Sequence, residues 1–164
     1  MGSALAMLAA GWYSQRLLSR GVSSRLARGI LGGSSVVLGG AALAMLPYVP
    51  GTAVKIALTT LGVALPSVIF VISNAVVGEI TPAAQRGALL AIGTAVASSA
   101  GLLAPFIMGS VIESATTPLD GFNTGFFMSG VIMLVGGAIA MVLVNPERDA
   151  KRRSVRLQPV TASA

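Results

Sequence analysis

The sequence predicts an all-α membrane protein with four full transmembrane helices and a partial one at the N-terminus. Hydrophobic residues make up 54% of the chain and charged residues only 10%, whereas a soluble domain usually carries about 25% charged residues. Charged residues also mark the ends of four long uncharged runs, each longer than the roughly 20 residues that a spanning helix needs. We therefore expect one membrane-embedded portion over residues 1–145 and a basic cytoplasmic tail over residues 146–164.

The composition excludes several classes of function. The chain has no Cys and no His, which rules out disulfide frameworks, thiolate chemistry and the usual zinc sites. The sequence shows no nucleophile and base pair and no phosphate-binding loop, so we expect neither an enzyme nor a cofactor. The net charge of +6 comes from basic residues gathered almost entirely in two places, and an aromatic content of 5% offers no stacking platform for bases. Both features argue against a nucleic-acid partner.

The first 13 residues are apolar and end on Trp12 and Tyr13, whose amphipathic rings favour the membrane interface. A helix over these residues reaches about 20 Å, short of the roughly 30 Å hydrocarbon core. We interpret the segment as the second half of a truncated spanning helix. The alternative is an interfacial or signal-like segment, although a signal peptide carries its positive charge before the apolar run, and here the charge follows it.

A polar segment over residues 11–28, GWYSQRLLSRGVSSRLAR, supplies four arginines and is expected to be a loop. After it, the uncharged runs of 26, 23, 26 and 26 residues cover 29–54, 56–78, 87–112 and 121–146. Each run is predicted to be one transmembrane helix.

Turn-forming residues separate these spans. They fall at Pro47, Pro50 and Gly51, at Thr81 and Pro82, over residues 117–121, and at Asn145 and Pro146. Proline removes a backbone donor and disfavours helix in the residue before it, so these positions end helices. Thr81 is expected to be the N-cap of the third span with Pro82 as its first residue. The stretch 117–121 is interpreted as an exposed loop.

The basic residues determine the expected orientation. Counting crossings places residues 11–28, Arg86 and the basic tail on one side, and Lys55, Glu113 and Asp120 on the other. Nearly all of the positive charge then lies on the first side, which the positive-inside rule makes cytoplasmic. The four spans and this orientation predict a multi-pass protein with a cytoplasmic C-terminus. The residue usage, rich in Ala, Gly and Arg, is typical of bacteria, so we expect a bacterial inner membrane.

Small or kinking residues recur at every fourth position of the third span, and such a row lets another backbone approach closely in lipid. This predicted packing stripe consists of Gly93, Ala97, Gly101, Pro105 and Gly109. Further glycines lie in the first and fourth spans, at positions 29, 33, 39 and 40 and at positions 125, 136 and 137. We expect most of these glycines to serve helix packing alone.

Four residues of the second and third spans are predicted to line a substrate path, namely Pro66, Asn74, Ser98 and Ser99. Pro66 lies near the centre of the second span, where it frees a backbone carbonyl and bends the helix. Transporters place binding sites at such breaks, because freed backbone needs a cavity or a neighbour. The alternative is that the polar groups of these residues form hydrogen bonds within the helix bundle and contact no substrate. No ionisable residue lies deep in a predicted span, so no proton relay is visible.

The pattern Gly11-x-x-x-Gln15-Arg16-x-x-x-Arg20 resembles the loop signature of the major facilitator superfamily, G-x-x-x-D-R-x-x-x-R/K. That signature joins helices two and three and repeats in weaker form between helices eight and nine. Gln15 stands where the family has Asp, as often happens in the second copy. The resemblance extends to helices eight to twelve through residues 81–87, 101–109 and 122–149, and it is strongest to the anion:cation symporter branch.

The resemblance implies a secondary active transporter of organic anions such as sugar acids or aromatic carboxylates. A full member has two six-helix halves with the substrate site between them, so the chain is expected to be truncated and inactive alone. Its implied partners are the missing N-terminal half and the lipid bilayer. Gly11, Arg16 and Arg20 match gating-loop residues, whereas Gln15 lacks the charge of the family's Asp. The alternative role of the arginines is orientation and headgroup contact.

A second hypothesis, of a different class, is a small multi-pass membrane protein that acts as an interaction or assembly subunit. It would associate through the packing stripe over residues 93–109. This hypothesis needs no missing transporter half. It predicts a defined oligomer in detergent, and persistent aggregation would argue against it.

Overall fold

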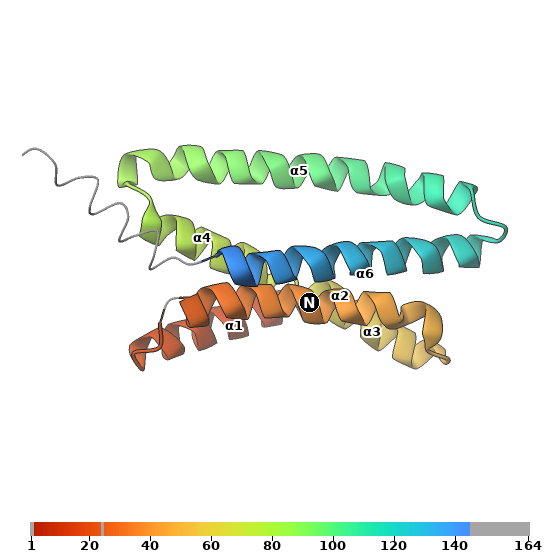
Figure 1. Cartoon of the computed structure of the whole chain (residues 1–164), viewed down its shortest axis with the longest axis horizontal. Coiled ribbons are helices and arrows are strands. Elements are labelled where there is room, and N and C mark those ends of the chain that lie inside the picture. The colour runs from red at the N-terminus through yellow and green to blue at the C-terminus, as the bar shows by residue number, and fades with distance from the viewer. Residues whose placement is uncertain (1, 24, 145–164) are drawn as a thin grey trace, which may run out of the picture.

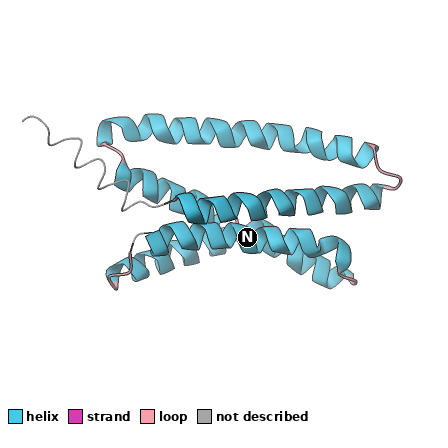
Figure 2. Ribbon diagram, in the orientation of Figure 1, coloured by secondary structure: helices cyan, strands magenta, loops and turns pink. Residues whose placement is uncertain are grey.

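The computed structural model describes residues 2–23 and 25–144, and within these ranges the chain forms helices and turns without a strand (Figure 1, Figure 2). The described α-helices are α1 (Gly2–Ser19), α2 (Leu31–Met45), α3 (Thr52–Ala64), α4 (Val68–Ile80), α5 (Ala83–Glu113) and α6 (Pro118–Leu143). A π-helical segment, Arg25–Ile30, precedes α2, and a 3-10 turn, Leu46–Tyr48, follows it. The expected basic tail and the expected helix end at Asn145 and Pro146 lie outside the described residues.

Four helical stretches in the described ranges are long and apolar enough to cross a membrane. They are Leu31–Tyr48, Thr52–Ile80, Ala83–Glu113 and Pro118–Leu143. Their number and order confirm the four predicted spans. α1 is not among them. Its 18 residues extend beyond the apolar first 13 and include Arg16 in the last turn.

α1 continues through much of the segment that was expected to be a loop, and that expectation was wrong. The helix ends only at Ser19, where the amides of Gly21 and Val22 donate to the carbonyls of Leu18 at 3.0 Å and Leu17 at 3.1 Å. Gly21 has a φ of +77°, the left-handed conformation that closes such a helix end and that glycine adopts without strain. Gln15, Arg16 and Leu17 have high helix propensity, so the helix continues through them to Ser19.

The start of α5 differs from the expected cap at Thr81. Pro82 occupies the N-cap position, no side chain caps the helix, and α5 begins at Ala83. Thr81 instead ends α4, with its amide donating to the carbonyl of Val77 at 3.1 Å. Thr81 is extended, as a residue before proline usually is, but Pro82 is extended as well, with a ψ of 145°, so the helix begins one residue later than expected. The Nε of Arg86 donates to the Thr81 carbonyl at 3.0 Å and ties the turn to α5.

The stretch 117–121 is the start of α6, and the expectation of a loop there was wrong. Thr117 is the N-cap, and its Oγ1 accepts a hydrogen bond from the Asp120 amide at 3.2 Å and donates one to Asp120 Oδ2 at 2.7 Å. Pro118 occupies the first helical position. A Thr-Pro-x-Asp sequence supplies both a capping hydroxyl and a helix-compatible proline, so it starts a helix.

The second span breaks at Pro66, as predicted. α3 ends at Ala64 and α4 begins at Val68. The amides of residues 68–70 donate to carbonyls only three residues earlier, at 3.0–3.2 Å. Because proline has no N–H, the carbonyl of Gly62 lacks its normal partner four residues along the helix, and the axis changes direction here.

Glycines bring α2 and α6 into direct backbone contact. A Cβ added at Gly33 would lie 2.9 Å from the carbonyl oxygen of Gly137, and one at Gly40 would lie 2.8 Å from that of Gly130. A Cβ at Gly130 would in turn lie 2.6 Å from the amide nitrogen of Ala44. Small residues are what allow such an approach in lipid, where close packing rather than water exclusion drives helix association.

The break in the second span packs against α2. A Cβ at Gly39 would lie 2.5 Å from the Pro66 ring and 3.3 Å from the Gly62 carbonyl oxygen, and Gly62 itself contacts the Leu43 side chain. Glycine on α2 therefore leaves the room that the proline ring occupies. The kink is held in place by a neighbouring helix.

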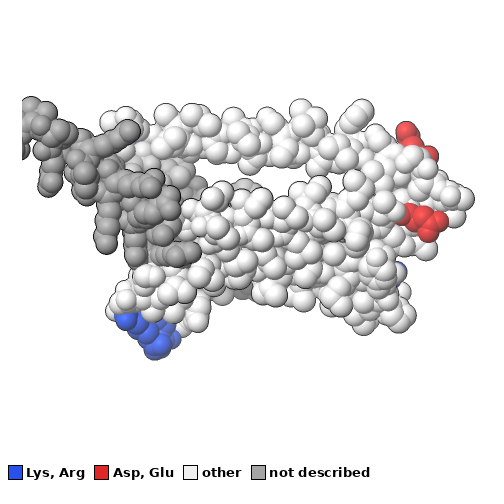
Figure 3. All heavy atoms as spheres, in the orientation of Figure 1, with Lys and Arg blue, Asp and Glu red and all other residues white. Residues whose placement is uncertain are grey.

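α5 lies apart from the rest of the bundle. It joins α4 at one end and α6 at the other (Figure 1), and open space separates its middle from the other helices (Figure 3). Every residue from 83 to 107 is exposed. A Cβ added at Gly93, Gly101 or Gly109 would meet no atom within 4 Å. No described helix contacts the three glycines of the predicted packing stripe directly, and the role of the stripe stays a prediction.

Charge separates the two ends of the molecule. Arginine side chains gather at the end where α1 finishes, whereas Glu113 and Asp120 lie at the opposite end, where α5 meets α6 (Figure 3). Lys55, in the first turn of α3, lies at this second end, and Arg86, in the first turn of α5, at the first. The helix order thus produces the charge distribution that was expected from counting crossings.

Candidate functional site

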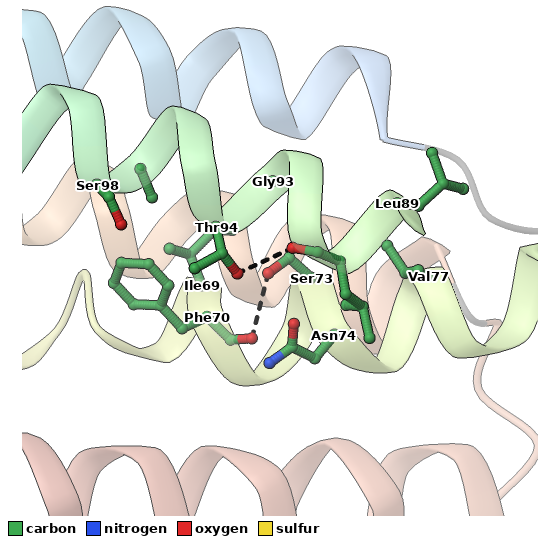
Figure 4. A pocket seen from close by; sticks show the side chains of 11 residues that line it. Ile69, Phe70, Ser73, Asn74, Val77, Leu89, Gly93, Thr94 and Ser98 are labelled. Atoms are coloured by element: carbon green, nitrogen blue, oxygen red, sulfur yellow. Dashed lines mark hydrogen bonds between the residues drawn. The ribbon is translucent and has the colours of Figure 1, made fainter. Parts of the chain in front are cut away.

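A cavity of about 570 Å³ lies between α4 and α5 (Figure 4). Its volume falls in the range of small-molecule sites. The lining residues come from one face of each helix, namely Ile69, Phe70, Ser73, Asn74 and Val77 of α4 and Leu89, Leu90, Gly93, Thr94, Ala97 and Ser98 of α5.

Helical spacing explains how these residues meet. Ser73 and Val77 are four residues apart on α4, and Leu90, Thr94 and Ser98 follow one another at the same spacing on α5, so each set shares a face of its helix. The short turn after α4 reverses the chain, and α5 then diverges from the bundle. The cavity is the space between these two diverging helices.

Two of its hydroxyl groups are held by their own helices. Ser73 Oγ donates to the Phe70 carbonyl at 3.1 Å, and Thr94 Oγ1 donates to the Leu90 carbonyl at 2.9 Å (Figure 4). Each hydroxyl hydrogen is therefore engaged, while the oxygen keeps lone pairs that accept. Both side chains thus offer hydrogen-bond acceptors to a ligand.

Asn74 and Ser98 supply the remaining polar groups. Neither side chain forms a hydrogen bond with another described residue, and both line the cavity. An amide or hydroxyl left without a partner in hydrocarbon is costly, so these groups need water or a ligand beside them. Asn74 offers two donors and one acceptor, and Ser98 offers one donor and an acceptor oxygen.

The cavity also has apolar walls and an aromatic ring. Phe70, Leu89 and Leu90 supply carbon surface, and no charged side chain is found among the described residues that line it. The described lining therefore offers hydrogen-bonding groups and apolar surface but no ion-pair partner. The described residues also contain no group of three or more Asp or Glu side chains placed to hold a metal ion.

The predicted path residues are divided between two places. Asn74 and Ser98 line the cavity together, whereas Pro66 faces Gly39 of α2 and Ser99 donates its hydroxyl to the carbonyl of Ala95 at 2.9 Å. Pro66 and Ser99 do not belong to the cavity lining.

Sequence reasoning missed Phe70, Ser73 and Thr94. Ser73 is the neighbour of Asn74, and Thr94 precedes Ser98 by one helical turn. The turn spacing between Thr94 and Ser98 was a signal that could have found one of them. Of the packing stripe, Gly93 and Ala97 line the cavity.

The residues that match the gating signature all lie on α1. Gly11 faces α4, since a Cβ there would lie 3.7 Å from Val71 Cγ1. Gln15, Arg16 and Arg20 are exposed. The structure therefore separates the pattern into one packing position and three exposed ones.

A smaller hollow of about 160 Å³ lies on the same helix and is lined by Trp12, Tyr13, Arg16, Leu17 and Arg20. The Arg16 guanidinium carbon lies 4.9 Å from the centre of the Trp12 ring, within cation–π range.

Comparisons with protein-family models, with curated proteins and with solved structures find no match for this chain.

Proposed function

We propose that this chain is the C-terminal portion of a secondary active transporter of the major facilitator type, located in a bacterial inner membrane with its C-terminus cytoplasmic. The observation that carries the proposal is the polar cavity between α4 and α5, beside a broken membrane-spanning helix. Pro66 is the central residue of the span Thr52–Ile80, and Ser98 is that of Ala83–Glu113. Ser98 thus lies near mid-depth, whereas Ser73 and Asn74 lie about two turns from the centre of their span, toward Ile80. A hydrogen-bonding group near mid-depth, next to a discontinuous helix, is typical of transporter substrate sites.

The lining favours a hydroxylated organic anion, such as a sugar acid, as the substrate. Ser73 and Thr94 present acceptor oxygens, which suit ligand hydroxyl groups as donors, and Asn74 and Ser98 both donate and accept. An aromatic carboxylate would use the Phe70 ring but leave most of these polar groups unpaired. The substrate carboxylate would be paired by a basic side chain of the missing N-terminal half.

In this proposal α5 is the helix that meets the missing half. Its residues from 83 to 107 are all exposed, and the glycines at 93, 101 and 109 leave room for another backbone. The site is then incomplete in this chain, which is proposed not to transport alone. Uptake of an organic acid by liposomes that contain only this chain would contradict this.

The α1 pattern has a proposed part in gating. Gly11 faces α4 at ordinary van der Waals distance, and Arg16 and Arg20 would contact neighbouring helix ends as the transporter alternates. Gln15 carries no charge, so the contact would rest on the arginines.

The open face of α5 also favours the second candidate, a small assembly subunit that associates through the stripe over residues 93–109. Sizing of the detergent-solubilised chain separates the two candidates. A single defined oligomer would favour the assembly subunit. Aggregation without a defined oligomer would favour a transporter portion that lacks its other half.

Ligand binding to the purified chain tests the cavity itself. Gluconate at about ten times its dissociation constant would stabilise the folded chain by about 1.4 kcal/mol, a rise in Tm of roughly 3–6 °C for a chain of this size. Asn74→Ala and Ser98→Ala should each reduce that rise. Ser99→Ala is the matched control, because Ser99 is the adjacent serine but lies outside the cavity.

Benzoate in parallel tests the aromatic alternative. A larger rise with benzoate than with gluconate would contradict the sugar-acid assignment. An equal rise in the Ser98→Ala and Ser99→Ala variants would remove the cavity as the binding site.

A further inference from the structure

The end of α1 carries a hollow that substrate recognition does not use. Its lining residues lie at positions 12, 13, 16, 17 and 20, a spacing that gathers them on one face of the helix. Trp12 is 62% exposed and Tyr13 49% exposed, and both guanidinium groups of the hollow are exposed as well. Basic side chains cluster at this outer corner of the bundle (Figure 3).

We propose that this hollow binds the phosphate headgroup of an anionic phospholipid. Arg16 is stacked on the Trp12 ring at 4.9 Å, which orients its guanidinium before a ligand arrives. Arg20 lies one helical turn further on and lines the same hollow. Guanidinium groups bind phosphate oxygens through paired N–H donors, and two of them can hold one phosphate from two sides.

Apart from the Trp12 ring, the charge at this site has no partner within the described chain. Neither Arg16 nor Arg20 forms an ion pair with a described carboxylate, and the adjacent Gln15 is neutral. Two positive charges therefore face the surroundings of the helix end. An anion from outside the chain is the ligand that this arrangement favours.

The depth of the residues points to a lipid rather than to a soluble anion. Trp12 and Tyr13 are residues that sit at the level of the headgroups, and Arg16 follows Trp12 by one turn, about 6 Å along the helix. Trp12, Tyr13 and Leu17 give the hollow apolar walls suited to the glycerol and upper acyl region of a lipid. A hydrated inorganic phosphate would gain nothing from those walls. The proposal needs only that the end of α1 meets the bilayer surface. It assigns Arg16 and Arg20 to headgroup contact, the alternative to gating, and it does not depend on the substrate cavity.

Trp12 is the only tryptophan of the chain, so its fluorescence reports on this hollow directly. The full chain is reconstituted in phosphatidylcholine vesicles that contain a small fraction of lipid brominated high on its acyl chain. Brominated phosphatidylglycerol should quench Trp12 more strongly than brominated phosphatidylcholine at the same mole fraction. The ratio of the two quenching responses gives the lipid preference at the site.

Removing the charges should remove the preference. Each basic residue near an anionic surface contributes about fivefold in affinity, so Arg16→Gln together with Arg20→Gln should lower the preference about 25-fold. Lys55→Gln, at the opposite end of the bundle, is the matched control and should leave it unchanged. Circular dichroism of each variant checks that the helices are retained.

Equal quenching by the two brominated lipids would overturn the proposal, and so would an unchanged preference in the double variant. Inorganic phosphate added at constant ionic strength distinguishes the other source of the same chemistry. Failure of phosphate to relieve the quenching supports the lipid site. Relief of the quenching at millimolar phosphate would assign the hollow to a soluble anion.

Discussion

The contact between α2 and α6 predicts that Gly130→Ala destabilises the fold. The new Cβ would lie 2.6 Å from the Ala44 amide nitrogen and 2.6 Å from the Gly40 carbonyl oxygen. Both atoms belong to the backbone of α2, so no side-chain rotation relieves the clash. The two helices have to separate, from 2.6 Å to the 3.4 Å of an ordinary van der Waals contact, a shift of about 0.8 Å.

The size of the effect follows from the dispersion energy that this shift removes. A gap of roughly 0.5–1 Å loses a quarter to a half of the attraction of each atom pair, and each pair contributes about 0.1–0.2 kcal/mol. If about 30 atom pairs line the seam, the loss is about 1–3 kcal/mol. This agrees with the roughly 1–3 kcal/mol that overpacking usually costs. In lipid the loss is direct, because helix association relies on such contacts.

The measurement is the free energy of unfolding in mixed micelles, from titration with a denaturing detergent followed by helical circular dichroism. Gly136→Ala is the matched control, because Gly136 lies on the same helix and a Cβ there meets nothing within 4 Å. Alanine's helix preference is common to both variants and cancels in the comparison. Equal stability of the Gly130→Ala and Gly136→Ala variants would refute the reasoning.

Two helix ends give further predictions. Thr117→Ala removes the hydroxyl that accepts from the Asp120 amide and should cost about 1 kcal/mol at the start of α6. Faster hydrogen exchange of the Asp120 amide would show this. Thr117→Ser should behave as the unmodified chain, and unchanged exchange in Thr117→Ala would contradict the cap. Gly21→Ala places a side chain at φ +77° and should cost about 1–2 kcal/mol at the end of α1. Faster hydrogen exchange of the Val22 amide, which donates to the Leu17 carbonyl, would show this loss of stability. Gly21→Asn should cost less, because Asn tolerates this conformation, and equal exchange rates in the two variants would contradict the explanation.

Much of the fold could be predicted from local sequence. Each spanning helix satisfies its own backbone hydrogen bonds, so a long uncharged run is sufficient to place it. The break at Pro66 follows in the same way, since a missing N–H acts within a single turn. The helix ends were less predictable. Thr117 caps α6 and Thr81 does not cap α5, although a proline follows both.

The cavity could be predicted only in part. Asn74 and Ser98 stand out in the sequence as polar residues within apolar spans, and both line it. Ser73 and Thr94 line it because of the rotation of α4 and α5 about their axes. A helical face is known from spacing, but the partner that it meets depends on how the helices cross.

The sequence by itself determined that the chain forms four membrane-length helices, that the second one breaks at Pro66, and how charge is divided between the two ends. These properties depend on composition and on interactions within a few residues. Only the tertiary structure decided which glycines bring helices together. The stripe from Gly93 to Gly109 has the regular spacing, yet it faces open space, whereas Gly40 and Gly130 are in backbone contact. Glycine permits a close approach on any helix, and the crossing of two particular helices determines where that approach occurs.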